Sequence, residues 1–350
     1  MTLRRLALLA FAALLATGGA FWLSSQRHLE RAVRAGDALL PQLRGAVNDV
    51  TEVRISRGDG SLATLQRGSD GWTVLERAYR ADAGKVRKLL LDLAALEVVE
   101  EKTHDPLRYA VLGVEDVSTP AAGGTRIDVK ESSGAIQSLV IGKPSGPRET
   151  YVRIAAAKPS FLARPQISAE ANPARWLETA LLDIDAARLR AATITPPGKP
   201  PRTLEVAQLS PGLAGALKAL AFDDVRPLSL PATRDAASGA AVKRVRFLTW
   251  DGLVLDVEGR EDGTRRWISI SAAVDPAPAR PAPAASAGTA APAADPAAEA
   301  ARLSRRFEGR EFEIPAFRFS ALFDASSPDA AAGVPPGAPR GLPPDGPPGT

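Results

Sequence analysis

The feature that most constrains this chain is an uncharged, largely apolar stretch of 18 residues, positions 6–23, close to its N-terminus. Its length approaches the roughly 20 residues that an α-helix needs to cross the hydrocarbon core of a bilayer. Arg4 and Arg5 precede the stretch, and positive charge at that end favours its retention in the cytoplasm. We therefore expect residues 1–26 to form a cytoplasmic N-terminus and a single transmembrane anchor. The soluble body would then lie on the periplasmic side of the cell inner membrane.

A cleaved signal peptide is the alternative interpretation of this segment. Residues 16–20 are small enough for a signal peptidase site. The apolar run continues past them, however, and Trp22 is a residue that settles at membrane interfaces, which favours a retained anchor. Both readings deliver the body to the same side of the membrane. The chain has no cysteine, so a lipid-modified cysteine, disulfides and thiolate metal ligands are excluded.

The charge of the chain does not indicate a nucleic-acid partner. Lysine and arginine total 44 against 40 acidic residues, and the two signs are interspersed, as in Glu101 and Lys102. Nucleic-acid binding instead calls for a clustered basic stripe. A length of 350 residues exceeds one typical domain, and an aromatic content of 5% predicts small aliphatic cores.

The first part of the body predicts an antiparallel α+β domain. A polar connector that adds little apolar surface is expected over residues 27–48, and the domain itself over residues 49–188. Short strands alternate with glycine turns, and Asp82 is placed to cap a helix with apolar residues at three- and four-residue steps. These apolar residues are Val86, Leu89, Leu90, Leu93 and Leu96. We expect the helix to pack on the meander that precedes it, whose strands are near residues 50–55, 62–66 and 72–75. Further strands are expected near residues 127–129, 136–141 and 151–154.

A second α+β domain is expected over residues 189–274. A strand at 203–207 precedes a helix capped by Ser210, with its apolar face at Leu213, Leu217 and Leu220. The order of strand, capped helix and strand repeats that of residues 72–102, which is a weak internal repeat. Strands at 242–250, 253–258 and 265–270, joined by Asp-Gly turns, predict a meander. The fold class is thus an N-terminal transmembrane helix followed by two tandem antiparallel-sheet-plus-helix domains.

The C-terminal part alternates between low complexity and apolar sequence. Residues 275–299 are rich in alanine and proline and predict a disordered spacer. Residues 300–325 contain six large apolar residues within twelve positions, and we expect them to dock on the second domain as an edge strand and a short helix. The tail, 326–350, is rich in proline and glycine and is expected to be disordered.

No residue pattern predicts catalysis, cofactor binding or a metal site. The two histidines are isolated: His28 lies beside the anchor, and His104 lies in a turn-like stretch. The acidic pairs at 100–101 and 223–224 are adjacent and would point to opposite faces of strands. Residues 142–146 superficially resemble a phosphate loop but lack its spacing, so they predict a hairpin turn. We expect no enzyme, no cofactor and no metal.

Short motifs between residues 71 and 184 carry a further signal. They are Gly-Trp-Thr-Val at 71–74, Ala-Asp at 81–82, Leu-Gly-Val-Glu-Asp at 112–116, Leu-Val-Ile-Gly-Lys at 139–143, Tyr-Val-Arg at 151–153, Trp-Leu at 176–177 and Leu-Leu-Asp-Ile at 181–184. In these motifs the chain resembles a bacterial domain family of unknown function associated with auxiliary components of gliding-motility-type ABC transporters. The resemblance implies membrane-anchored α+β domains, often in tandem, and carries over no catalytic residues. One departure is Pro120, which lies four residues after Asp116, where the family more usually has a proline almost at once.

The function expected from anchor and resemblance together is a non-enzymatic, extracytoplasmic accessory or scaffold subunit of an envelope ABC-type transport system. Its partners would be the membrane and proteins such as an ABC permease or another anchored subunit. An envelope module that binds a glycan or peptide is the alternative, and a deep pocket would favour it. An unrecognised hydrolase is a third class, and would need polar side chains that converge in such a pocket.

Overall fold

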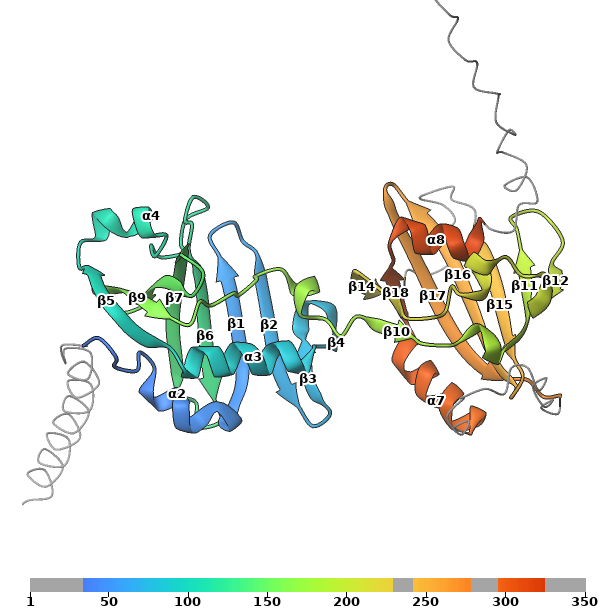
Figure 1. Ribbon diagram of the computed structural model, residues 1–350, viewed down its shortest axis with the longest axis horizontal. Coiled ribbons are helices and arrows are strands. Elements are labelled where there is room, and N and C mark those ends of the chain that lie inside the picture. The colour runs from blue at the N-terminus through green and yellow to red at the C-terminus, as the bar shows by residue number, and fades with distance from the viewer. Residues whose placement is uncertain (1–33, 229–241, 278–294, 325–350) are drawn as a thin grey trace, which may run out of the picture. The chain divides into compact units, whose positions relative to one another are not determined.

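The computed structural model of the chain describes residues 34–228, 242–277 and 295–324. The expected anchor, most of the expected spacer and the expected tail lie outside these residues. Within the described ranges, no helix is both long and apolar enough to cross a membrane. The described chain divides between Glu178 and Thr179 into two compact units, here called unit 1 and unit 2 (Figure 1). Each combines a few helices with antiparallel sheet, which confirms the α+β fold class.

Unit 1 is built on one nine-stranded sheet in which every neighbouring pair is antiparallel. Its order is β4-β3-β2-β1-β6-β7-β8-β9-β5. The strands are β1 Val50–Arg57, β2 Leu62–Gly68, β3 Gly71–Val74, β4 Tyr79–Arg80, β5 Glu97–Thr103, β6 Thr125–Glu131, β7 Ile136–Ser145, β8 Glu149–Ile154 and β9 Ser160–Arg164. The helical segments are α2 Pro41–Ala46, η1 Val47–Asp49, η2 Leu75–Arg77, α3 Ala83–Ala94, η3 Pro106–Arg108, α4 Tyr109–Leu112 and η4 Pro173–Trp176.

Helix α3 forms where the sequence predicts it and lies across the sheet of unit 1 (Figure 1). Asp82 caps it, since its carboxylate accepts a hydrogen bond from the Lys85 amide at 3.1 Å. The helix buries Val86, Leu89, Leu90 and Leu93. Leu96, the last expected residue of this apolar face, lies just beyond the helix and is also buried.

The expectation that the connector adds little apolar surface is wrong. Leu39, Leu40 and Leu43 are buried, and Leu43, which belongs to helix α2, is fully buried. The Leu39 amide donates to the Leu96 carbonyl, and the Gly36 amide donates to the Val98 carbonyl, both at 2.8 Å. Residues 36–43 therefore belong to unit 1, where they cover the end of α3 and the start of the edge strand β5.

Unit 2 contains a seven-stranded antiparallel sheet, ordered β12-β11-β15-β16-β17-β18-β14, and a separate pair, β10-β13. The strands are β10 Ala180–Leu182, β11 Leu189–Thr195, β12 Arg202–Glu205, β13 Leu220–Ala221, β14 Asp224–Pro227, β15 Lys243–Thr249, β16 Leu253–Asp262, β17 Arg265–Val274 and β18 Arg310–Glu313. The helical segments are η5 Ala186–Arg188, η6 Val206–Gln208, α5 Pro211–Ala214, α7 Pro296–Phe307 and α8 Ala316–Phe323. The predicted meander is present as β15, β16 and β17.

Two features of unit 2 differ from expectation at its C-terminal end. Helix α7 begins at Pro296, inside the expected spacer, because Asp295 caps it and Pro296 occupies the first turn. Strand β18 is not an edge strand, since it pairs with β17 on one side and with β14 on the other. Its Phe312 is fully buried and stacks edge-on with Phe307 of α7 at 5.7 Å between ring centroids.

The predicted helix after Ser210 forms only in part. Ser210 caps α5, but the helix ends at Ala214, and Leu220 instead lies in strand β13. Gly212 and Gly215 lie within this short stretch, and glycine is unfavourable in a helix by about 1 kcal/mol relative to alanine. The second copy of the expected repeat therefore has no counterpart of the twelve-residue α3.

A partly buried ionic cluster joins three elements of unit 2. The Arg188 guanidinium pairs with Asp251 at 2.7 Å and with Glu299 of α7 at 2.6 Å. The pKa of Arg188 is raised, first by its hydrogen bond to Glu299 and also by that to Asp251, although burial opposes the shift. The cluster therefore fixes the start of β11 and the turn after β15 to helix α7.

Candidate functional site

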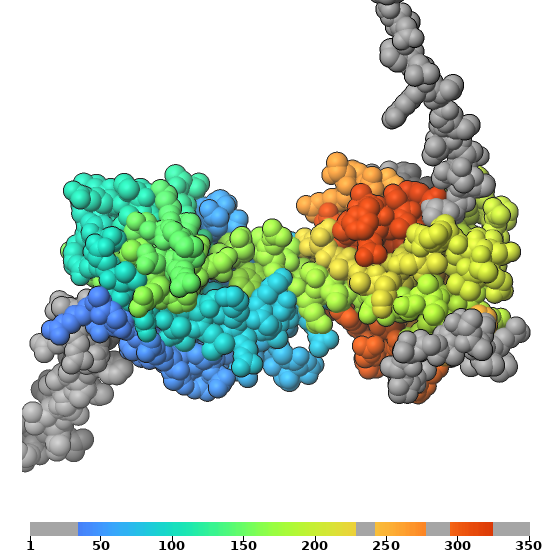
Figure 2. Space-filling model, viewed as in Figure 1, coloured from blue at the N-terminus to red at the C-terminus, as the bar shows by residue number. Residues whose placement is uncertain are grey.

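The two most exposed large apolar side chains of the described residues lie on one short helical run, residues 106–112, made of η3 and α4. Leu107 is 89% exposed and Val111 is 70% exposed. They are four positions apart, which places them on the same face of the run. Asp105 starts the run by accepting a hydrogen bond from the Leu107 amide at 3.0 Å, and Gly113 ends it with φ = 70°. Figure 2 shows this segment, coloured teal, at the surface of unit 1.

The opposite face of the run is packed onto the sheet. Tyr109 is buried with Val114 and Val140 in a small apolar cluster. The Tyr109 hydroxyl donates to the Lys158 carbonyl at 2.5 Å. Burial raises the pKa of Tyr109, and the positive charge of Arg153 opposes this shift. The helical run thus has a fixed buried face and an open apolar face.

Two close backbone approaches hold the end of α4 against β7 and β6. A methyl group added at Gly142 would lie 2.4 Å from the Leu112 carbonyl oxygen, and one added at Gly124 would lie 2.7 Å from that of Gly113. Neither position has room for a side chain. The Lys143 ammonium then donates to the Val111 carbonyl at 3.0 Å, which satisfies a carbonyl at the helix end.

The centre of the arrangement is the buried guanidinium of Arg153 in β8, whose side chain is 3% exposed. Its Nε donates to the Val114 carbonyl at 2.8 Å, and its Nη2 donates to the Asp116 carboxylate at 2.6 Å. Its Nη1 donates to the carbonyls of Ala155 at 2.9 Å and Ala157 at 3.2 Å. The guanidinium also lies 4.8 Å from the centre of the Tyr109 ring. Every nitrogen of this side chain is therefore engaged, and the residue positions the 109–116 segment.

The three inner motifs that carried the family resemblance therefore meet at one place. The motifs at 112–116, 139–143 and 151–153 supply the end of α4, the glycine beneath it and the buried arginine. We name this set the arginine cluster: Tyr109, Gly113, Val114, Asp116, Gly142 and Arg153. Within the cluster the Arg153 guanidinium holds the backbone carbonyls of Val114, Ala155 and Ala157 and the carboxylate of Asp116, which is the work of a structural support.

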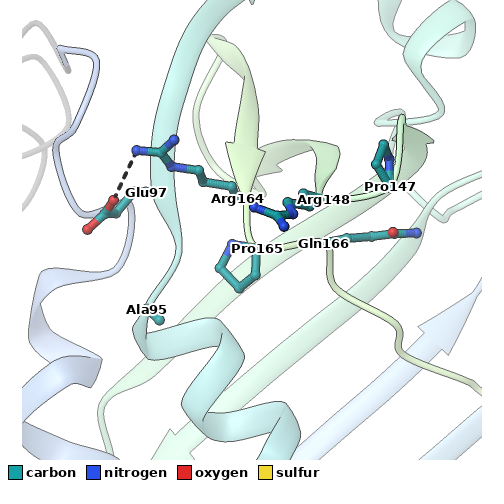
Figure 3. A pocket seen from close by; sticks show the side chains of 7 residues that line it. All are labelled: Ala95, Glu97, Pro147, Arg148, Arg164, Pro165 and Gln166. Atoms are coloured by element: carbon teal, nitrogen blue, oxygen red, sulfur yellow. Dashed lines mark ion pairs between the residues drawn. The ribbon is translucent and has the colours of Figure 1, made fainter.

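An open cleft of about 520 Å³ lies elsewhere on unit 1 (Figure 3). It is lined by Ala95, Glu97, Pro147, Arg148, Arg164, Pro165 and Gln166. Arg164 lies 3.9 Å from Glu97, whose other oxygen pairs with Arg44 at 3.1 Å. Arg148 has no ion pair within the described part of the chain. Two guanidiniums beside proline rings can hold an anionic group such as a carboxylate.

The residues that the sequence offered as candidates for chemistry do not come together in one site among the described residues. His104 is exposed and contacts Glu101, and His28 lies outside the described residues. Residues 142–146 form the end of β7 and the turn to β8, so the hairpin prediction is confirmed. Asp224 belongs to strand β14. Among the described residues, no three histidine, cysteine, aspartate or glutamate side chains group as they would around a metal ion.

The buried role of Arg153 was missed from sequence. Arg153 belongs to the Tyr-Val-Arg motif, but its partners Val114 and Asp116 lie 39 and 37 positions away. The only signal was the recurrence of these motifs in the resembled family.

Unit 1 is thus an antiparallel α+β domain in which the arginine cluster supports a short surface helix. Comparison with protein families places a domain of unknown function, DUF4340, at residues 72–219. This match begins in β3, includes the whole arginine cluster and the cleft, and ends before β13. It confirms the resemblance to a domain of unknown function. No curated protein and no solved structure matches the chain.

Proposed function

We propose that this chain is a membrane-anchored, extracytoplasmic accessory subunit of an envelope ABC-type transport system, which acts by binding partners and performs no chemistry. The uncharged stretch at 6–23 supports the anchor, and Arg4 and Arg5 support the orientation. The resemblance to a family associated with auxiliary transporter components supports the transport system.

The observation that carries the proposal is what the arginine cluster does. The motif residues of the matched domain hold a surface helix from beneath, and that helix presents Leu107 and Val111 to the outside. A scaffold subunit needs a surface of fixed shape, because pre-organised contacts lose less conformational entropy on binding. Exposed apolar side chains on such a support are characteristic of an interaction surface.

The test is purification of the full-length chain in mild detergent through an affinity tag, with identification of the proteins recovered. Recovery of an ABC permease or its ATPase supports the proposal, and repeated recovery of neither contradicts it. In a complementation assay, a chain whose first 23 residues are replaced by a cleaved signal should lose function.

Single alanine substitutions of His104, Ser145 and Asp224 should leave complementation intact in the same assay. Loss of function in one of these folded variants, with no transporter protein recovered, would instead favour the hydrolase.

A ligand-binding module is a second candidate, favoured by the cleft and by Arg148, which has no ion pair with any residue that the structure describes. Its two guanidiniums and proline rings suit a peptide that carries a carboxylate. Titration of the full-length chain with acidic peptides tests this candidate. Arg148→Ala should weaken binding, whereas Arg54→Ala, an exposed arginine of β1 with no ion pair among the described residues, should not.

A further inference from the structure

We propose that the exposed face of residues 106–112, led by Leu107 and Val111, rests in the headgroup region of the bilayer that carries the anchor. This inference rests on the anchor in the proposed function and deepens it, because it names the bilayer as the partner that this face of unit 1 contacts. Transporter proteins would then bind the chain at other surfaces. The first observation is that these are the two most exposed large apolar side chains among the described residues. Both project from one helical run four positions apart.

The second observation is the position of this run relative to the tether, residues 24–33, which joins the expected anchor to unit 1. Ten residues separate Leu23, the end of the apolar stretch, from Arg34, where the described chain begins. Fully extended, they reach at most roughly 40 Å. Unit 1 therefore remains within that distance of the bilayer surface in the anchored chain.

The tether enters unit 1 on the strand that leads to the helical run. The Gly36 amide donates to the Val98 carbonyl, and the Val98 amide donates to the Asp37 carbonyl, so the chain enters beside β5. Leu107 follows Val98 by nine residues, a span of at most about 30 Å. Figure 1 shows the start of the described chain and α4 toward the same end of unit 1. The tether is therefore long enough for this apolar face to reach the membrane.

The third observation is the charge around the face. Three basic residues lie near the face. Lys143 donates to the Val111 carbonyl, Arg108 is exposed within the run, and exposed Lys158 accepts the Tyr109 hydroxyl at its backbone carbonyl. Among the neighbouring acids, Asp105 caps η3 and pairs with Arg108, Glu115 accepts from the Gly123 amide, and Asp116 is bound to Arg153. Lys143 and Lys158 have no carboxylate partner among the described residues and supply the positive charge of the border. An apolar centre with a cationic border matches the interface of a membrane that contains anionic lipid.

The absence of native cysteine permits a direct test with the full-length chain. Leu107→Cys and Val111→Cys are each labelled with an environment-sensitive fluorophore and reconstituted into phosphatidylcholine and phosphatidylglycerol vesicles. Ile136→Cys is the matched control, because Ile136 is an apolar residue of the same unit and is 61% exposed. We expect a blue shift and strong quenching by nitroxide-labelled lipid at positions 107 and 111. The label at position 136 should show neither.

The other outcomes separate the possible errors. Labels at 107 and 111 that stay as exposed to water as the label at 136 overturn the inference while leaving the anchor intact. A blue shift without lipid quenching shows that a second copy or another protein covers the face, and also overturns it. Flotation of the vesicles is measured in parallel, and failure of the chain to float refutes the anchor and this inference with it. The melting temperature of each variant establishes that it is folded.

Discussion

The support given by Arg153 can be tested by replacing this residue with methionine, which keeps an apolar stem of similar length and removes all donors. The substitution removes the hydrogen-bond donor of three backbone carbonyls, those of Val114, Ala155 and Ala157. Asp116 loses its partner too, but its side chain is 63% exposed and returns to water at little cost. An unsatisfied buried acceptor costs about 1 to 3 kcal/mol, which applies in full to the Val114 carbonyl. The carbonyls of Ala155 and Ala157 are only part-buried, so each costs less.

Water that enters the vacated space will satisfy part of this loss, so we expect Arg153→Met to lower the free energy of unfolding of unit 1 by about 2 to 4 kcal/mol. Equilibrium urea unfolding measures the change in the free energy of unfolding, and amide hydrogen exchange shows which residues lose protection. Exchange should accelerate first in residues 106–116. The control is Arg126→Met, a half-exposed arginine of β6 paired with Asp128, for which we expect less than about 1 kcal/mol.

Unchanged exchange in residues 106–116 of the Arg153→Met variant, with an unfolding midpoint equal to that of Arg126→Met, would refute the reasoning. The guanidinium would then not be needed to hold the helix.

Three further predictions concern other parts of the structure. Leu43→Ala should lower the free energy of unfolding by about 2 to 5 kcal/mol because Leu43 is fully buried, whereas the same change at exposed Leu107 should stay within about 0.5 kcal/mol in the same urea titration. Gly142→Ala should cost about 1 to 3 kcal/mol, since the added methyl group meets a backbone carbonyl of α4, and thermal unfolding will detect it. Burial raises the pKa of Asp251, but its hydrogen bonds, chiefly that from Arg188, outweigh this and leave it lowered. The stability that Asp251 contributes is therefore present above its unfolded pKa, about 4, and is lost as the pH falls through the lower folded value. Asp251→Asn should accordingly be less stable at pH 7 and should lose less stability on acidification, as measured by urea unfolding between pH 7 and pH 2.

Sequence alone predicted the features that short-range patterns determine. Asp82 and the apolar residues spaced three and four positions apart after it predict α3, a helix of 12 residues. Gly252 and Gly263 adopt the positive φ angles of the turns that join β15, β16 and β17. These features depend on neighbours in the chain, so their signal is local. The same logic placed the Ser210 cap correctly but overestimated the helix that follows it.

The features that sequence did not predict depend on distant partners or on weak local signals. Leu43 lies in a helix of six residues, too short for its periodicity to stand out, and is buried by α3 and its surroundings. The start of α7 at Pro296 was hidden by the alanine and proline content around it. The contacts of Arg153 depend on how β8 meets the end of α4, which spacing along the chain does not contain.

The position of β18 between β17 and β14 has a consequence for the order in which the chain is made. Strand β14 pairs with β18 through residues as far apart as Asp224 and Glu313, 89 positions later. During synthesis from the N-terminus, unit 1 has all of its strands once Arg164 has emerged, whereas β14 and the open side of β17 wait for the last part of the chain. Unpaired strand edges promote aggregation and proteolysis. A product that stops before Arg310 therefore leaves two strands without their shared neighbour, so premature termination exposes unit 2 to degradation while unit 1 still completes its sheet.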